Sequence, residues 1–354
     1  MRRSLSIAWL LCLGCSGRAA PLPTATTWPE ADALFRSDPR WMGADGAYSI
    51  DLGGDRTLWL FGDTNLAREL ADPHHSTAFI RNSVAIQTGR DPSHALIEFA
   101  WQQDTDGAPH SFLAEDGGDW FWPEHGVRLD DKLLIFWQRV QTPTGDPTGF
   151  AGAGWRAIVV DDPDDSPLVW SMHDATSPAN DLGITLGGAV AIVGTNVYVY
   201  GSRGVTHDVL LARFDRHAAH DGDLSDPEWW SGDAGWVRGA NANPVVIAGT
   251  NAPEFSVHHD PIVNQWVMVM SEGYGATTLA LRVADNPEGP WTDPRSFLRP
   301  PESFDDDAFG YAGKAHPELT GADLVVTYVP SRFVDRPDAA DTLYHPHFVR
   351  LTWP

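Results

Sequence analysis

Cysteine is almost absent from this chain. Of its 354 residues only Cys12 and Cys15 are cysteines, and both lie among the first twenty residues. The rest of the chain therefore offers no internal disulfide and no cysteine-based metal site. Basic residues are scarce as well: the chain has 24 Lys and Arg but 48 Asp and Glu, and its formal net charge is −24. Nucleic acids and anionic membrane surfaces require a basic footprint, so this balance argues against both as partners.

Long apolar runs are also missing beyond the N-terminus, so no later segment is expected to span a membrane. Residues 1–20 combine a basic start at Arg2-Arg3 with an apolar stretch and then small residues, which predicts a signal peptide and an exported protein. The run Leu13-Gly14-Cys15-Ser16 resembles a bacterial lipoprotein box, in which Cys15 is lipidated. Cleavage after Ala20 is the alternative. The predicted location is extracellular, periplasmic or on the outer surface, with a lipid anchor as the one membrane contact.

Several catalytic signatures are absent too. The chain has no Gly-rich phosphate loop, no Gly-x-Ser-x-Gly elbow and no Cys/His pair, which argues against nucleotide binding and Ser or Cys hydrolysis. No close His/Asp spacing typical of a metal site is apparent, so no metal and no cofactor are expected.

What the chain has is turn residues and aromatics, with 33 Gly, 27 Pro and 16 Trp, a balance typical of an all-β protein. An apolar run after a turn occurs five times, and each run is followed by another strand-like segment. Five such units predict a five-bladed β-propeller as one domain over 41–354, preceded by a tether and lead-in over 21–40. A β-sandwich is the alternative. The five runs are Leu58–Phe61, Leu133–Trp137, Val197–Tyr200, Trp266–Met270 and Leu324–Tyr328.

The stretch from Trp41 to Thr64 predicts a β-hairpin that turns at Gly53-Gly54-Asp55. Asp45 and Asp63 each lie nine residues from Gly54. Antiparallel pairing should therefore bring the two carboxylates together at the open end of the hairpin. The alternative for either residue is a turn-capping aspartate.

Counting residues from the turn of each of the other units predicts which of their residues lie at the same rim of the propeller as Asp45 and Asp63. Acids, a few cations and aromatic rings suit a neutral, hydroxyl-rich polysaccharide, and two carboxyl groups are what glycoside cleavage requires. Asp45 and Asp63 are thus the catalytic candidates. The alternative role of Glu124 is a salt bridge to Arg128 or Arg139. The alternative role of His316 is that of a hydrogen-bonded core histidine. A structural cation in the central channel is compatible with the same sequence. The predicted substrate-binding residues are Arg81, Asn82, Trp122, Glu124, His125, Arg203, Glu254, His316 and Tyr344.

Several motifs resemble the family catalogued as domain of unknown function 4185: W-M-G-A-D-G-A-Y-S-I, L-W-L-F-G-D-T-N, F-I-R-N-S-V-A and F-W-P-E-H-G-V-R-L. The resemblance implies a five-bladed propeller, and some members of that family are endo-acting D-arabinan hydrolases. It also implies that Asp45 and Asp63 match a paired acidic motif. The expected function is hydrolysis of an arabinan-like or related polysaccharide by a monomer, and the alternative is a non-catalytic glycan- or protein-binding propeller.

Overall fold

The computed structural model describes residues 20–68, 77–145, 149–178, 180, 182–239, 242–250, 252–272, 278–305, 307–332 and 343–354. Residues 1–19 of the predicted signal peptide, with Cys15, lie outside the described residues. Within the described part, none of the helices has the length and apolar character needed to cross a bilayer. The prediction of an all-β protein is confirmed, since strands dominate the described chain and its helices are short.

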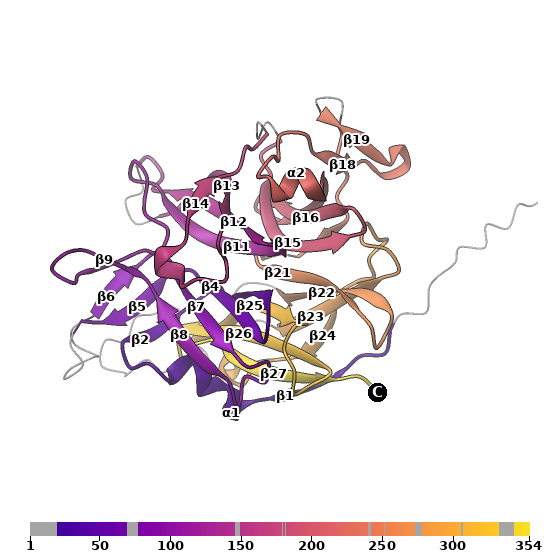
Figure 1. Ribbon diagram of the computed structural model, residues 1–354. Helices are drawn as coiled ribbons and strands as arrows, with labels where there is room; N and C mark the ends of the chain where they lie inside the picture. Colours follow the sequence, from indigo (N-terminus) through magenta and orange to yellow (C-terminus); the bar gives the residue numbers. More distant parts are fainter. Residues whose placement is uncertain are drawn as a thin grey trace, which may run out of the picture.

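Five antiparallel sheets, here called sheets I to V, carry the long strands (Figure 1). Sheet I contains β3 (Tyr48–Gly53), β4 (Arg56–Phe61), β7 (Ser83–Thr88) and β8 (Leu96–Ala100). Sheet II contains β11 (Trp120–Leu129), β12 (Lys132–Gln141), β13 (Ala151–Val160) and β14 (Met172–Asp174). Sheet III contains β15 (Thr185–Val193), β16 (Asn196–Arg203), β17 (Asp208–Asp215), β18 (Glu228–Trp230) and β19 (Trp236–Arg238), with β20 (Ala248–Gly249) paired to β17. Sheet IV contains β21 (Phe255–Asp260), β22 (Gln265–Glu272), β23 (Thr278–Ala284) and β24 (Arg295–Leu298), and sheet V contains β25 (Ala308–His316), β26 (Leu324–Arg332), β27 (His347–Thr352) and β1 (Thr24–Thr27).

Smaller elements decorate these sheets. A three-stranded sheet of β2 (Trp41–Ala44), β5 (Thr64–Ala67) and β6 (Thr77–Ile80) extends sheet I, and β9 (Gln102–Gln103) pairs with β10 (Pro109–His110). The helices are α1 (Pro29–Asp32) and α2 (Arg216–His220), with 3₁₀ turns η1 (Leu34–Arg36), η2 (Pro167–Val169), η3 (Gly232–Ala234) and η5 (Pro301–Phe304).

Each of the five apolar runs found in the sequence is the second strand of one sheet: β4, β12, β16, β22 and β26. These strands read as continuous apolar runs because both of their faces are covered. In β4, for example, Thr57 to Phe61 are all buried. Each run therefore lies between two other strands of its own sheet and is covered on both faces.

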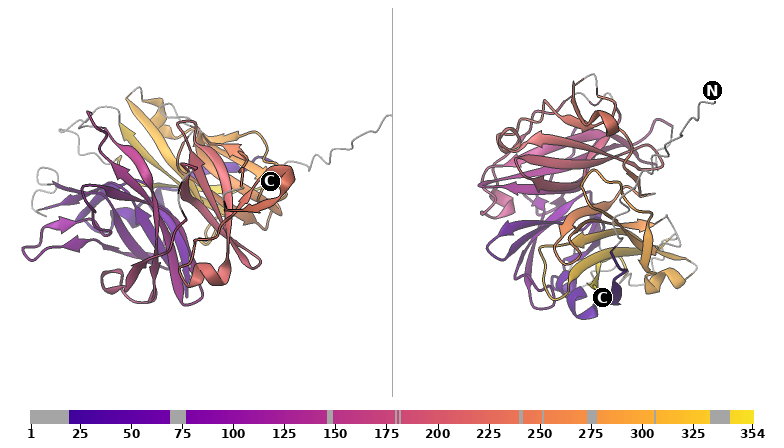
Figure 2. Two further views of the ribbon diagram at one scale, coloured as in Figure 1. Left: turned by 90° about the horizontal axis from the view of Figure 1, so that it is seen from above. Right: turned by 90° about the vertical axis from the view of Figure 1, so that its right-hand side faces the viewer.

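Five apolar cores lie between successive sheets. They join sheets I and II, II and III, III and IV, and IV and V. A fifth core, with Trp59 and Phe61 from β4, Val325 from β26 and Phe348 from β27, joins sheet V back to sheet I. Figures 1 and 2 accordingly show the indigo strands of sheet I beside the yellow strands of sheet V.

The segment expected to be a tether and lead-in contributes to this last core. Strand β1 pairs along β27, and Asp32 Oδ1 accepts a hydrogen bond from the backbone N–H of Phe348 at 2.7 Å. Trp28, Leu34 and Phe35 are buried between the first and last sheets. The physical reason is the helical spacing of these apolar residues, which places them on one face of α1 and η1.

We predict that Trp28→Ala lowers the free energy of unfolding by about 3–5 kcal/mol, because it empties a core position that is 1% exposed. Leu22→Ala is the matched control, since Leu22 is 43% exposed in the same segment and should change stability by less than about 0.5 kcal/mol. Urea unfolding measures both variants. Equal, small effects of the two variants would show that the segment is a tether after all.

Candidate functional site

The first hairpin changes sheets at Asp45 and Asp63. Tyr48 pairs with Leu60 in the β3–β4 ladder, and Asp45 N–H donates to Asp63 C=O at 3.4 Å. Beyond the two acids the two backbone segments of the hairpin pair again, as β2 and β5. The predicted register is confirmed, but the acids lie at a break within a longer ribbon rather than at its open end. The reason is that β2 and β5 continue the ribbon as part of the small sheet with β6.

Two glycines make this break possible, and they account for the W-M-G-A-D and F-G-D-T motifs. A Cβ on Gly62 would lie 2.3 Å from Asp45 Oδ1, so the carboxylate rests directly on the Gly62 backbone. A Cβ on Gly43 would lie 1.8 Å from the carbonyl oxygen of Tyr344. Larger residues at either position would displace Asp45 or Tyr344.

Comparable irregularities occur in three other first strands. The register shifts between Pro123 and Gly126 in β11, between Leu186 and Ala189 in β15, and between Tyr311 and Lys314 in β25. Such bulges bend a strand and redirect its side chains, often beside functional sites. Glu124 lies within the first of these shifts and Lys314 follows the last.

Lys314 is the buried cation of the site. Its Nζ donates to the carbonyl oxygen of Gly46 at 2.6 Å and to that of Ala312 at 3.2 Å, and lies 3.5 Å from Glu254 Oε1. It also lies 4.2 Å from the centroid of the Tyr48 ring. Three acceptors match the three N–H bonds of an ammonium group. Lys314 therefore joins the break in sheet I to Glu254, which precedes β21 of sheet IV.

Asp45 has surroundings that favour its neutral form. Burial raises the pKa of its carboxyl group, and the nearby carboxylates of Asp63 and Glu254 raise it further. The hydroxyl group of Tyr311 donates to Asp45 Oδ2 at 3.0 Å and partly opposes this rise in pKa, and Tyr344 O–H donates to the carbonyl oxygen of Asp63 at 3.1 Å.

Asp63 has partners that favour its anion. Trp122 Nε1–H donates to Asp63 Oδ1 at 2.8 Å, and Arg81 NH1 lies 3.5 Å from Oδ2. Burial still raises the pKa of Asp63, but both of these groups act in the opposite direction. The two aspartates are thus adjacent carboxyl groups in unlike electrostatic environments, an arrangement typical of acid–base pairs.

Glu124 is the third acid with a perturbed proton affinity. It is buried on β11 and accepts a hydrogen bond from Tyr48 O–H at 3.1 Å. Burial raises its pKa to about 8, Glu254 adds to the rise, and Lys314 opposes it. The surroundings of Glu124 therefore favour its protonated form.

Aromatic rings and Arg81 adjoin the acids. The Arg81 guanidinium lies 4.3 Å from the centroid of the Trp120 ring. The rings of Trp122 and Phe150 meet edge to face at 4.9 Å between centroids, and Phe150 is 65% exposed. Exposed ring faces of this kind can stack on the C–H surfaces of a sugar.

Three of the predicted substrate-binding residues have their polar atoms occupied by the fold. Asn82 bonds to Leu113 N–H and C=O and to the carbonyl oxygen of Phe121. His125 Nδ1 accepts from Val190 N–H at 2.9 Å, so its Nε2–H donates to Ser49 C=O at 3.0 Å. His316 bonds to Ser49 Oγ at 2.6 Å and to Thr327 Oγ1 at 2.7 Å. These contacts join neighbouring strands and loops, and they occupy both ring nitrogens of each histidine and the amide of Asn82. A substrate-binding role for the three residues stays a prediction.

The structure brings Arg81, Trp122, Glu124, Glu254 and Tyr344 together around Asp45 and Asp63. Arg203 ends β16 half-buried, and among the described residues no hydrogen bond or ion pair joins it to the acids. Sequence reasoning missed Tyr48 and Tyr311 and left Lys314 out of the predicted site. These residues could have been found from their positions in the first strand of a unit, in or beside an irregularity of that strand.

Comparison with known proteins identifies similar folds. The chain superposes on a suspected hydrolase from Bacteroides ovatus with a TM-score of 0.68 and 17% identity, covering 92% of this chain and 90% of that one. An exo-β-1,3-galactanase from Phanerochaete chrysosporium matches with a TM-score of 0.51 and 10% identity, over 88% of this chain and 63% of that one. The family 43 glycoside hydrolase BlXynB from Bacillus licheniformis matches with a TM-score of 0.50 and 13% identity, over 92% and 54%. At these identities the likeness concerns the fold.

A search of curated proteins finds no match. A family model matches residues 30–353, nearly all of the described chain. It differs from the family expected from the motifs, domain of unknown function 4185. The chain belongs to the family described as domain of unknown function DUF5005.

Proposed function

We propose that this protein is a glycoside hydrolase that cleaves a neutral polysaccharide at the rim formed by Asp45 and Asp63. The observation that carries the proposal is that these two acids are joined by a backbone hydrogen bond and interact electrostatically, Asp45 beside Glu254 and Asp63 beside Trp122 and Arg81. Glycoside cleavage uses one protonated and one ionised carboxyl group. Similar folds include a galactanase and a family 43 glycoside hydrolase, which supports the same chemistry.

Asp45 would act as the general acid, because burial and neighbouring carboxylates keep its proton in place. Asp63 would be the ionised partner, acting as base or nucleophile, since Trp122 and Arg81 stabilise its negative charge. Glu124, protonated and bonded to Tyr48, would contact substrate hydroxyl groups.

The substrate would stack on the aromatic side of the site. Phe150 and Phe79 are 65% and 52% exposed, and they flank Trp122 and Arg81 respectively. Arabinan-like polysaccharide remains one proposed substrate, based on the motif resemblance, and other neutral glycans fit the same surface.

The five sheets would form the blades of a five-bladed β-propeller, in one domain that functions as a monomer. The core that joins sheet V to sheet I supports this arrangement. We further propose export through the N-terminal signal, with either cleavage near Ala20 or lipidation of Cys15.

Replacing Asp45 or Asp63 with Asn should lower kcat by about 10²–10⁴-fold, because each substitution keeps the shape and removes a proton donor or a negative charge. Binding of the polysaccharide should persist. Reducing-sugar release measures the rate, and isothermal titration calorimetry measures binding.

Asp55→Asn is the matched control for these variants. Asp55 lies at the turn of the same hairpin, is 79% exposed at its side chain and has a positive φ that Asn tolerates. Full activity in D45N and D63N would refute the assignment. If the wild type binds a glycan and cleaves none, the protein is a binding module.

Activity should decline as pH rises through about 8, and stability should decline over the pH range between 4.5 and 8. Burial raises the pKa of Glu124 from 4.5 to about 8 and that of Asp45 in the same direction. As pH rises through about 8, both groups lose protons beside Asp63 and Glu254, so kcat/KM should fall. Between pH 4.5 and 8 the unfolded chain has already released the Glu124 proton that the folded chain retains, so stability falls as pH rises, by at most about 1.4 kcal/mol per pH unit.

Glu124→Gln should remove this part of the pH dependence of unfolding, whereas Glu98→Gln, at an exposed position of β8, should leave it unchanged. Urea unfolding at pH 6 and pH 8 compares the variants. An identical loss of stability in wild type and E124Q would contradict a buried, protonated Glu124.

A further inference from the structure

Helix α2 lies at the opposite ends of the strands from the acids described above. It follows β17, and Asp215 caps it by accepting hydrogen bonds from the backbone N–H groups of His217 and Ala218, both at 3.0 Å. Arg216 NH2 lies 2.8 Å from Asp130 Oδ1, in the turn between β11 and β12. The helix of sheet III is therefore held against a turn of sheet II.

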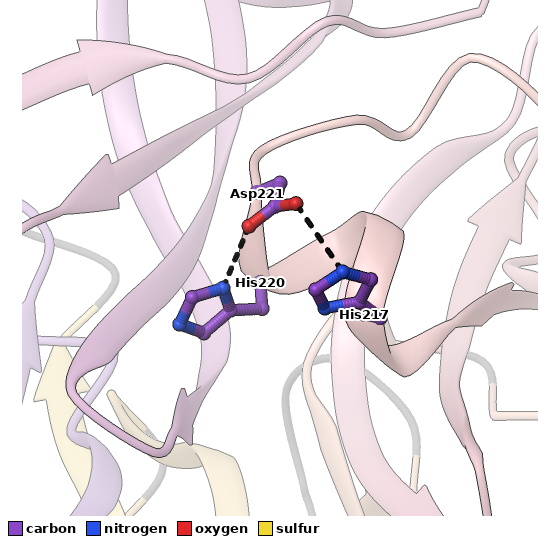
Figure 3. Close-up of side chains that lie close together, drawn as sticks. All are labelled: His217, His220 and Asp221. Atoms are coloured by element: carbon purple, nitrogen blue, oxygen red, sulfur yellow. Dashed lines mark hydrogen bonds and ion pairs between the residues drawn. The ribbon is translucent and has the colours of Figure 1, made fainter.

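Three potential metal ligands gather on this helix and its C-terminal residue. Figure 3 shows the carboxylate of Asp221 between two imidazole rings, with one oxygen toward each. His220 Nδ1 lies 2.8 Å from Asp221 Oδ1, and His217 Nε2 lies 3.8 Å from Asp221 Oδ2. One ligand atom from each residue lies within 4.8 Å of the others.

These separations suit a tetrahedral ion. Zinc bonds to His nitrogen and carboxylate oxygen are about 2.0–2.2 Å long, which places ligand atoms roughly 3.3–3.5 Å apart around a tetrahedron. The two contacts of Asp221, at 2.8 and 3.8 Å, lie on either side of that value. A rotation of the His217 side chain, which is 88% exposed, would shorten its distance to Asp221.

The second nitrogen of His220 provides an independent observation. His220 Nε2 lies 2.8 Å from Asp131 Oδ1. A metal-bound histidine usually donates its other ring N–H to a carboxylate, which fixes the tautomer and orients the ring. In the tautomer that donates Nε2–H to Asp131, the lone pair of Nδ1 faces the Asp221 carboxylate, so a divalent cation can be bound by both groups.

We propose that His217, His220 and Asp221 form a surface site for a zinc-type divalent transition metal, with Asp131 as the carboxylate that orients His220. The three ligands lie within five consecutive residues, His217-Ala218-Ala219-His220-Asp221, a spacing that the sequence alone did not identify as a metal motif. Imidazole and carboxylate ligands suit zinc, whereas Mg²⁺ and Ca²⁺ prefer oxygen ligands alone.

The site is accessible to solvent. Both imidazoles line a surface cavity of about 370 Å³ together with Asp130, Thr195 and Arg216. Water from this cavity can complete the coordination of the ion. Because the ligands belong to sheet III and Asp131 belongs to the β11–β12 turn of sheet II, a bound ion strengthens the contact between the two sheets.

Zinc chloride titrated into purified, tag-free, EDTA-treated protein tests the proposal by isothermal titration calorimetry. One Zn²⁺ should bind per chain, and excess Zn²⁺ should raise Tm by a few degrees. His217→Ala should weaken binding at least tenfold and abolish the Tm shift, because it removes a ligand whose exposed ring supports no core contact. Asp131→Asn should weaken binding about 10–100-fold.

His94→Ala is the matched control, since His94 is an exposed histidine paired with Asp91 at 3.3 Å and lies away from α2. Wild-type affinity in H94A and unchanged binding in the presence of millimolar Mg²⁺ would support the site. No uptake by the wild type, or equal uptake by H217A, would overturn it. In that case a proton on His220 bridges Asp131 and Asp221 in place of the metal.

Discussion

The candidate site depends on the buried ammonium group of Lys314. Its three acceptors belong to the break in the first hairpin, to its own strand and to Glu254, so one side chain joins sheets I, IV and V at the site. Removing this charge would leave the carbonyl oxygen of Gly46 and the carboxylate of Glu254 without their cation in a buried setting, where unpaired polar groups are costly. Burial lowers the pKa of Lys314, and the nearby carboxyl groups of Glu254, Glu124 and Asp45 oppose that shift.

Regular and irregular parts of the fold have different tasks. The second strands, apolar on both faces, build the five cores between sheets. The first strands depart from regular pairing at the break beside Asp45 and at the bulges of β11 and β25, and the site residues cluster there. Gly62 and Gly43 permit the close contacts that the break requires. The sheets thus hold the acids in place beside the break in the first hairpin.

Much of the fold follows from residue patterns, whereas the site follows from them only in part. The apolar runs and the hairpin register around Gly54 were predictable because both depend on residues close together in the sequence: a stretch of apolar side chains and the turn residues beside it. For His125 and His316, the strand pairing predicts the position of each residue along its strand, but it does not predict which groups form hydrogen bonds with each ring. Tyr311 was missed because the bulge in β25 shifts the pairing register by one residue. The motifs around Asp45 and Asp63 suggested domain of unknown function 4185, whereas the family model that matches residues 30–353 is DUF5005.

The central claim is that the acids around Asp45 and Asp63 cleave glycosidic bonds. Digestion of a panel of neutral polysaccharides, arabinan among them, by the purified protein tests it most directly when products are separated by chromatography. The account predicts that at least one polysaccharide is cut into defined oligosaccharides or monosaccharides. Binding of a glycan without release of any product from the whole panel would contradict it.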